Sequence, residues 1–129
     1  MSKLICILED DAGIRDILQF LLLEEGYQVA CFTTVNEFFS RKHINPDLYL
    51  LDVMLPDGNG MAVCKLLKAD PQTAATPVVM MSAHADIQQM TSGCNAEEFV
   101  VKPFDIFVLL KKIVDLLNLK SAGKDTYSS

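Results

Sequence analysis

The sequence predicts an α/β fold in which five parallel strands form one doubly wound sheet with helices on both faces. Short apolar runs alternate five times along the chain with segments that have helical spacing or helix-start signals. Successive strand–helix units of this kind imply parallel strands joined by right-handed crossovers. The strands are also apolar almost throughout, as expected for strands that are buried on both sides. The 129 residues suit a single domain with one core.

The five strands are expected at residues 3–8, 27–32, 47–51, 77–81 and 99–101. The helices between and after them are expected at about residues 14–22, 34–42, 59–67, 85–93 and 105–117. The fourth of these helices has little apolar face and is weakly indicated. The other long helices carry apolar residues three and four positions apart, which is typical of a helix packed on a sheet.

Local signals set the limits of the elements in the first half of the chain. The first strand ends at the acidic residues 9–11, and the first helix ends before Gly26, because glycine is a common helix terminator. Thr34 and Glu37 have the spacing of a capping box, in which both side chains bind backbone amides at a helix start. Residues 56–58, Pro-Asp-Gly, indicate a turn after the third strand.

The second half of the chain shows similar signals. Asn59 is expected to cap the third helix, and Pro77 begins the fourth strand, a position where proline is tolerated. The last helix starts at Asp105. Residues 1–119 are therefore expected to form the domain, and residues 120–129 are expected to be an irregular polar tail or the start of a linker.

Composition excludes several classes of function. The net charge is −6 and the pI is about 4.7, so we expect no direct binding to nucleic acid or anionic membranes. The longest apolar runs are too short to span a bilayer, and the N-terminus lacks the pattern of a signal peptide. The four cysteines are far apart and have no metal-ligand spacing. A cytoplasmic protein with reduced cysteines is the simplest interpretation.

Polar side chains follow four of the five predicted strands. Glu9 and Asp10 follow the first strand, Asp52 the third, Ser82 the fourth and Lys102 the fifth. Each of these residues alone is a weak indication, because aspartate or serine after a strand usually belongs to a turn or cap. The carboxyl ends of parallel strands meet at one edge of the sheet, where ligands bind. The five side chains are therefore expected to converge.

This group of side chains has a chemical consequence. Carboxylates about 4 to 6 Å apart repel each other by roughly 1–4 kcal/mol per pair at intermediate dielectric, so they need raised pKa values or a bound cation. Oxygen ligands and several waters suit Mg²⁺. An Asp52 oxygen would attack a phosphoryl group whose charge the metal and Lys102 neutralise, while Ser82 donates a hydrogen bond to it. Asp11 is expected to cap the first helix instead of binding metal.

Four short motifs in combination resemble those of response-regulator receiver domains: Glu9-Asp10, Leu51-Asp52-Val-Met-Leu-Pro56, Met81-Ser82-Ala83 and Val101-Lys102-Pro103-Phe104. The resemblance covers about residues 3–119. It implies a flavodoxin-like sheet with strand order 2-1-3-4-5. It also implies that Asp52 accepts a phosphoryl group from a sensor histidine kinase or phosphotransfer protein, as a switch with Mg²⁺-dependent self-phosphorylation and self-dephosphorylation and not as a metabolic enzyme.

The resemblance also implies roles for individual residues. Glu9, Asp10, Asp52 and the backbone carbonyl of Met54 would bind Mg²⁺, and Lys102 would contact the phosphoryl group. The Lys102–Pro103 peptide bond would be a candidate for the cis form. In the switch of this family, Ser82 is coupled to an aromatic ring on the fifth strand, and that ring is Phe99 in this sequence.

Two features depart from the family pattern. Asn95 stands where a glycine commonly precedes the fifth strand, and it also tolerates left-handed dihedral angles. The stretch between Ser82 and Lys102 is a couple of residues short, so the fourth helix is expected to be truncated or irregular.

Phosphorylation would act on a downstream effector protein or a covalently linked output domain. In the last helix, Phe107, Val108 and Val114 lie outside the main apolar stripe. They could contact a partner, form a homodimer face or pack against neighbouring helices.

Three alternatives stay open at this point. A degenerate receiver would serve as a phosphorylation-independent interaction module. A flavin-binding electron carrier would need a phosphate loop after the first strand, where this chain has acids. A hydrolase that forms an aspartyl phosphate would need a second acid two residues after Asp52, where this chain has Met54.

Overall fold

The computed structural model describes residues 2–40, 44–83 and 94–128. Five parallel strands form the central sheet: β1 (Leu4–Leu8), β2 (Gln28–Phe32), β3 (Leu48–Asp52), β6 (Val78–Ser82) and β7 (Glu98–Val101). Their order is β2-β1-β3-β6-β7, so the predicted order 2-1-3-4-5 is confirmed. The predicted strand limits are correct to within one residue at each end.

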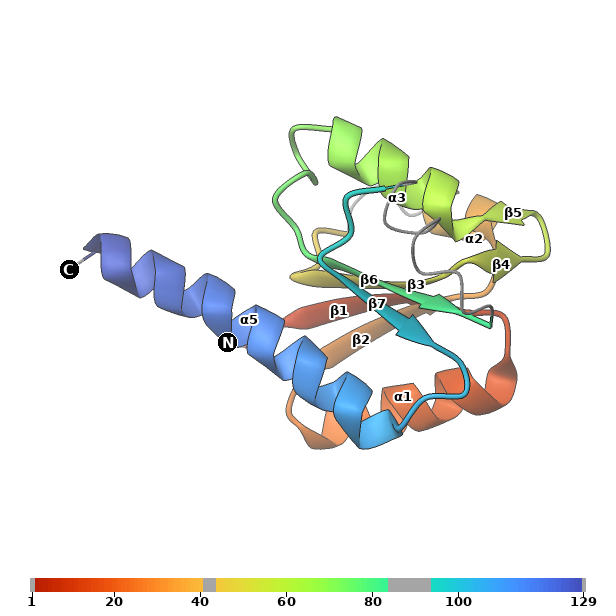
Figure 1. Ribbon diagram of the computed structural model, residues 1–129, viewed down its shortest axis with the longest axis horizontal. Coiled ribbons are helices and arrows are strands. Elements are labelled where there is room, and N and C mark those ends of the chain that lie inside the picture. The colour runs from red at the N-terminus through yellow and green to blue at the C-terminus, as the bar shows by residue number, and fades with distance from the viewer. Residues whose placement is uncertain (1, 41–43, 84–93, 129) are drawn as a thin grey trace.

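Helices cover both faces of this sheet (Figure 1). Helices α1 (Ala12–Glu24) and α5 (Ile106–Ser128) lie on one face, and α2 (Val35–Ser40) and α3 (Gly60–Ala69) lie on the other. A short antiparallel pair, β4 (Met54–Leu55) and β5 (Gly58–Asn59), occupies the loop between β3 and α3. This loop directly follows Asp52, so its conformation affects the position of the Asp52 side chain.

Alternation along the strands divides the core into two clusters, one on each face. The cluster under α1 and α5 contains twelve buried residues: Ile5, Ile7, Leu18, Leu22, Leu48, Leu50, Val79, Met81, Val100, Leu109, Ile113 and Leu117. The cluster under α2 and α3 includes Cys6, Leu8, Phe32, Phe38, Tyr49, Leu51, Val63, Cys64 and Met80. Since both faces bury apolar side chains, the strands are apolar at nearly every position.

Side-chain caps fix the starts of three helices. The carboxylate of Asp11 accepts a hydrogen bond from the amide of Ile14 at 3.0 Å, and Asn59 accepts one from the amide of Met61 at 2.7 Å. Both predicted caps are confirmed. Thr34 accepts a hydrogen bond from the amide of Glu37 at 3.0 Å, but the Glu37 carboxylate returns to the amide of Thr33 and not to that of Thr34.

One expectation about local structure is wrong. Residues after Lys120 were expected to be irregular, but α5 continues to Ser128 and extends past the end of the sheet (Figure 1). No proline interrupts this stretch, so the backbone ladder continues without needing an apolar face. Asn95 tolerates left-handed dihedrals but does not use that tolerance, because no described residue other than glycine has positive φ.

Some expectations lie outside the described residues. The weak fourth helix at residues 85–93 is among them, so its truncation stays a prediction. The limit of the domain at residue 119 also stays a prediction. No helix in the described part of the chain is both long and apolar enough to cross a bilayer.

Candidate functional site

Three carboxylates meet at the carboxyl edge of the sheet. Glu9 follows β1, Asp52 ends β3, and these two strands are hydrogen-bonded neighbours with Leu8 opposite Leu51. One carboxylate oxygen from each of Glu9, Asp10 and Asp52 lies within 4.8 Å of the other two. Glu9 is fully buried and Asp52 is 5% exposed, whereas Asp10 is exposed. The cluster therefore has a buried floor and an accessible mouth.

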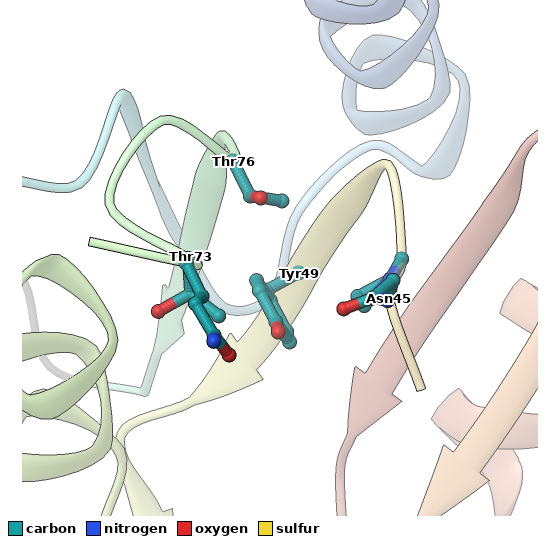
Figure 2. Close-up of a pocket in the computed structure, with 6 residues that line it drawn as sticks. Asn45, Tyr49, Thr73 and Thr76 are labelled. Atoms are coloured by element: carbon teal, nitrogen blue, oxygen red, sulfur yellow. The ribbon is translucent and has the colours of Figure 1, made fainter. Parts of the chain in front are cut away.

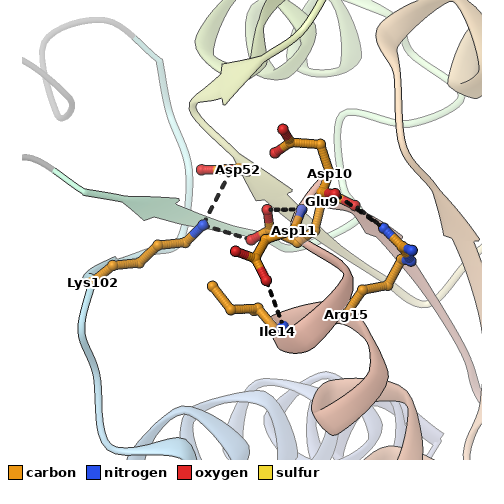
Figure 3. Close-up of polar contacts among 7 residues, drawn as sticks. All are labelled: Glu9, Asp10, Asp11, Ile14, Arg15, Asp52 and Lys102. Carbon is orange, nitrogen blue, oxygen red and sulfur yellow. Dashed lines mark hydrogen bonds and ion pairs between the residues drawn. The ribbon is translucent and has the colours of Figure 1, made fainter.

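Lys102, which follows β7, contacts both buried acids (Figure 3). Its ammonium lies 2.6 Å from Glu9 Oε1 and 3.2 Å from Asp52 Oδ2. We call the four residues Glu9, Asp10, Asp52 and Lys102 the acidic pocket. With all groups ionised the pocket has one positive and three negative charges. A divalent cation would balance this excess.

Burial and charge shift the pKa values of two pocket residues. Burial raises the pKa of Glu9 above its ordinary value, and the charge of Asp52 acts in the same direction, while the hydrogen bond from Lys102 opposes the rise. Burial by itself would lower the pKa of Lys102. The hydrogen bond to Glu9 and the charges of Asp52 and Glu9 outweigh it, so the pKa of Lys102 is raised. Lys102 therefore stays protonated near neutral pH.

Backbone hydrogen bonds hold the acidic turn after β1. The amide of Glu9 donates to the carbonyl of Phe32 at 3.0 Å, and the amide of Asp11 donates to Glu9 Oε2 at 3.1 Å. Arg15, on α1, donates from Nη1 to the carbonyls of Glu9 at 3.1 Å and Asp10 at 3.3 Å (Figure 3). Sequence reasoning missed Arg15, because nothing in its spacing distinguishes it from a surface arginine.

The loop after Asp52 is closed against the Asp52 backbone. The amide of Gly60 donates to the carbonyl of Val53 at 2.7 Å. A Cβ atom at Gly60 would lie only 1.9 Å from the Asp52 carbonyl oxygen. Only glycine therefore permits this approach without backbone movement. Sequence reasoning also missed this requirement, although Gly60 lies within the Gly-Asn-Gly stretch after the predicted turn.

The other predicted residues lie at or near this edge. Ser82 is buried at the end of β6, and its carbonyl accepts a hydrogen bond from the amide of Lys102 at 2.6 Å. Phe99 is partly buried against the core cluster under α2 and α3, and Met54 lies in β4. The Lys102–Pro103 peptide bond is cis, as predicted. The switch roles of Ser82 and Phe99 and the metal contact of Met54 stay predictions.

Comparison with known proteins identifies the family. The chain matches the family model of the response regulator receiver domain over residues 5–114. It belongs to that family. Receiver domains are the phosphoacceptors of two-component response regulators, and they bind Mg²⁺ at an acidic pocket.

Two curated response regulators illustrate the relationship. The chain is 34% identical over 116 residues to the DNA-binding dual master transcriptional regulator RpaA of Synechocystis sp., a match that covers 88% of this chain and 48% of that protein. It is 34% identical over 107 residues to the DNA-binding response regulator MtrA of Mycobacterium tuberculosis, covering 81% of this chain and 46% of that protein. The receiver thus spans about half the length of these curated relatives.

A solved structure shows the same fold. The signal receiver domain of a signal transduction histidine kinase from Syntrophus aciditrophicus aligns with a TM-score of 0.83 at 29% identity, and the alignment covers 91% of both chains. The agreement confirms the fold expected for this family.

The residues of this receiver fit Mg²⁺. The donor atoms available at the cluster are carboxylate oxygens from Glu9, Asp10 and Asp52, and hard oxygen ligands are those that Mg²⁺ prefers. Two of the three acids are buried beside each other, an arrangement that a bound cation stabilises.

The described surface also has hollows outside the acidic pocket. A cavity of about 440 Å³ lies at the opposite, amino edge of the sheet (Figure 2); we call it the amino-edge cavity, and it is lined by Asn45, Pro46, Tyr49, Gln72, Thr73 and Thr76. A groove of about 240 Å³ lies beside the acidic pocket between α1 and the start of α5, and it is lined by Ile14, Ile17, Lys102, Pro103, Phe104 and Ile106. We call it the apolar groove.

Proposed function

We propose that this receiver is switched by phosphorylation of Asp52, with a phosphohistidine on a sensor histidine kinase or phosphotransfer protein as the donor. The observation that supports the proposal most strongly is the position of the Asp52 carboxylate. It is nearly buried, it contacts the ammonium of Lys102 at 3.2 Å, and it lies within a cluster of acids suited to a divalent cation. Phosphoryl transfer requires mainly such positioning and charge neutralisation.

Each pocket residue has a task in this reaction. An Asp52 oxygen attacks the phosphorus atom, a P–O bond forms, and the P–N bond to the donor histidine breaks as the imidazole takes up a proton. Lys102 binds the transferred phosphoryl group through its protonated amine. Glu9, Asp10, Asp52 and the backbone carbonyl of Met54 would hold Mg²⁺, which when bound supplies positive charge for the phosphoryl oxygens.

The modification would then change the conformation of the receiver. Phosphorylation adds about −1.5 to −2 charges, and Lys102 contacts the new group in place of one of its present carboxylate partners. The hydroxyl of Ser82, at the end of the adjacent strand, donates a hydrogen bond to a phosphoryl oxygen. The ring of Phe99 turns toward the space that Ser82 leaves. With Mg²⁺ bound, the pocket would also support self-phosphorylation from small donors and self-dephosphorylation.

The apolar groove gives the phosphodonor protein a place to dock. Lys102 lines both the groove and the acidic pocket, so a protein bound in the groove lies next to Asp52. Ile17 and Phe20 on α1 are 53% and 63% exposed. These exposed apolar side chains on the adjoining helix extend the surface available to such a partner.

Output would pass to an effector protein or to a covalently linked output domain. The curated relatives are DNA-binding regulators of about twice this length, while this chain has a net charge of −6 and is proposed not to bind nucleic acid directly. Phe107 and Val108 on α5 are 68% and 52% exposed and suit a phosphorylation-dependent homodimer. The cysteines of the chain are free, which is consistent with a cytoplasmic location.

The test is incubation of the purified protein with acetyl phosphate and Mg²⁺, followed by intact-mass measurement. The wild-type protein should gain one phosphoryl group, and Asp52→Asn should gain none. Asp16→Asn, which removes an exposed acid from α1, is the matched control and should be modified like the wild type. A wild-type protein that stays unmodified with Mg²⁺ present would contradict the proposal.

A further inference from the structure

We propose that Asp57 is a positioning residue of the acidic pocket: by binding the first turn of α2 it fixes the loop after Asp52 and so raises the affinity of the pocket for a divalent cation. This inference rests on the proposed function. It concerns a residue that is exposed and separate from the acidic cluster, since the cluster contains Glu9, Asp10 and Asp52.

Both oxygens of the Asp57 carboxylate bind backbone amides of α2. Oδ1 accepts a hydrogen bond from the amide of Val35 at 2.7 Å, and Oδ2 accepts one from the amide of Asn36 at 2.9 Å. These are the first two residues of α2, and amides in that position have no acceptor within the helix. The hydrogen bonds to them also lower the pKa of Asp57, so the carboxylate is charged at neutral pH.

Helix α2 does not need Asp57 for a local cap. Thr34 already binds the amide of Glu37, and Glu37 binds the amide of Thr33. The additional cap comes from 21 to 22 residues away in the sequence. It therefore connects two parts of the chain, which a local cap does not do.

A packing contact supports the same connection. A Cβ atom at Gly58 would lie 3.0 Å from Cγ2 of Val35, so the backbone next to Asp57 rests closely on the α2 side chain. The tip of the loop after Asp52 is thus bound to α2 by two hydrogen bonds and by van der Waals contact.

The base of the same loop packs against the backbone of Asp52 and Val53. Met54 pairs with Asn59 and Leu55 with Gly58 in an antiparallel hairpin, and the amide of Gly60 closes the loop on the carbonyl of Val53. The hairpin is short, with two residues in each strand. A shift of its tip therefore moves β4, which carries Met54, the residue whose carbonyl is proposed to bind the metal.

The contact of Asp57 with α2 and the binding of a cation at the acidic pocket should therefore affect each other. While Asp57 holds the tip, β4 keeps one position relative to Asp52, and less conformational freedom is lost when the cation binds. Conversely, binding of the cation at the base of the loop should change the environment of the Val35 and Asn36 amides, to which Asp57 is hydrogen-bonded. Loss of outer contacts that orient metal ligands commonly weakens metal affinity by about 10- to 100-fold.

The experiment compares wild type, Asp57→Ala and Asp57→Asn by calorimetric titration with Mg²⁺ and by amide NMR spectra, both at about 0.1 M and about 1 M salt. Asp57→Ala should raise the Kd for Mg²⁺ on the order of tenfold at both salt concentrations. Asp57→Asn keeps one acceptor oxygen, and its Kd for Mg²⁺ should lie between those of wild type and Asp57→Ala. In wild type, Mg²⁺ should shift the amide signals of Val35 and Asn36, and in Asp57→Ala these shifts should disappear.

Control variants separate positioning from simpler effects. Asp16→Ala removes an exposed acid that binds no amide of α2 in the described structure, and it should leave the Kd nearly unchanged. Val35→Ala removes the packing contact with Gly58 and leaves every carboxylate in place. It should raise the Kd for Mg²⁺, as Asp57→Ala does. It also serves as the test variant if either Asp57 variant fails to fold.

Three results have defined meanings. An unchanged Kd in folded Asp57→Ala, with only the stability lowered, overturns the inference, because Asp57 then serves α2 alone. An increase in Kd that disappears at about 1 M salt also overturns it, since a charge acting at a distance is screened there. Absence of Mg²⁺ binding to the wild type instead contradicts the proposed function itself.

Discussion

The two edges of the sheet differ in chemistry. At the carboxyl edge, the acidic pocket brings three carboxylates within 4.8 Å of one another and a lysine in contact with two of them. At the amino edge, the amino-edge cavity of about 440 Å³ is lined by amides, hydroxyls, a proline and the phenol of Tyr49. Strand β3 contributes Asp52 to one and Tyr49 to the other.

Under the proposed function, it is the charge of the carboxyl edge that marks the site. The amino-edge cavity has no carboxylate or ammonium among its lining residues, so its lining offers no charged group to a phosphoryl group or a cation. The carboxyl edge gathers charged groups because the loops that leave parallel strands meet there. At the same edge the pKa values of two charged neighbours, Glu9 and Lys102, are both raised. Substitutions at the carboxyl edge should therefore change the phosphorylation rate and the Mg²⁺ affinity more than substitutions at the amino edge.

Removal of the positive charge from the acidic pocket should have the largest effect. In Lys102→Met, phosphorylation by acetyl phosphate should slow by about 100-fold, the cost typical of losing one group that stabilises developing charge. Rates are measured by intact-mass sampling over time. Lys112→Met is the matched control, because Lys112 binds Glu98 at the surface, and its rate should equal that of wild type. Equal rates for Lys102→Met and wild type would contradict the role of Lys102.

A change in the backbone next to Asp52 should have an intermediate effect. Gly60→Ala places a Cβ atom 1.9 Å from the Asp52 carbonyl oxygen, so the backbone must move. We expect the free energy of unfolding to fall by about 1–3 kcal/mol, measured by urea denaturation, and Mg²⁺ affinity to fall as well.

Gly13→Ala is the control for that variant. A Cβ atom at Gly13 would meet only the Asp11 carboxylate, at 3.3 Å, and the change should alter the free energy of unfolding by less than about 1 kcal/mol. If Gly60→Ala and Gly13→Ala have the same stability and the same Mg²⁺ affinity, then neither property depends on the close approach of Gly60 to the Asp52 carbonyl.

The amino edge should show the smallest effect. Tyr49→Phe removes a hydroxyl from the amino-edge cavity and should leave both the phosphorylation rate and the Kd for Mg²⁺ unchanged. A clear fall in either quantity would show that the two edges are coupled and would weaken the contrast between them.

Tyr49 also provides a prediction about pH. Burial raises its pKa from 10.0 to about 12, so the folded protein holds this proton more tightly than the unfolded protein. The stability associated with this shift is complete below pH 10.0 and is lost as pH rises through about 12. Urea denaturation at several pH values above 9 should show a shallower loss of stability in Tyr49→Phe than in wild type.

Much of this architecture was predictable from local signals. The convergence of Glu9, Asp10 and Asp52 and the approach of Lys102 follow from where polar residues stand after apolar strands. The order of the strands came instead from the resemblance of the motifs to receiver domains. The helix caps at Asp11 and Asn59 were also correct, because a cap acts on residues two or three positions away.

The features that escaped prediction depend on contacts between distant segments. Asp57 was interpreted as a turn residue, yet it caps a helix 21 to 22 residues earlier in the chain. The requirement for Gly60 arises only from the fold of the loop around the Asp52 carbonyl. The irregular tail was a wrong expectation, since polar composition after Lys120 indicated exposure and exposure does not prevent helix formation.

The most direct test of the account is an amide NMR titration of the wild-type protein with Mg²⁺. We predict saturable shifts at a single site that are largest for Glu9, Asp10 and Val53, with Tyr49 and Thr73 unchanged. In the double variant Glu9→Gln/Asp10→Asn these shifts should be absent at the same Mg²⁺ concentrations. Shifts centred on the amino-edge cavity, or full binding by the double variant, would contradict the assignment of the acidic pocket as the metal and phosphorylation site.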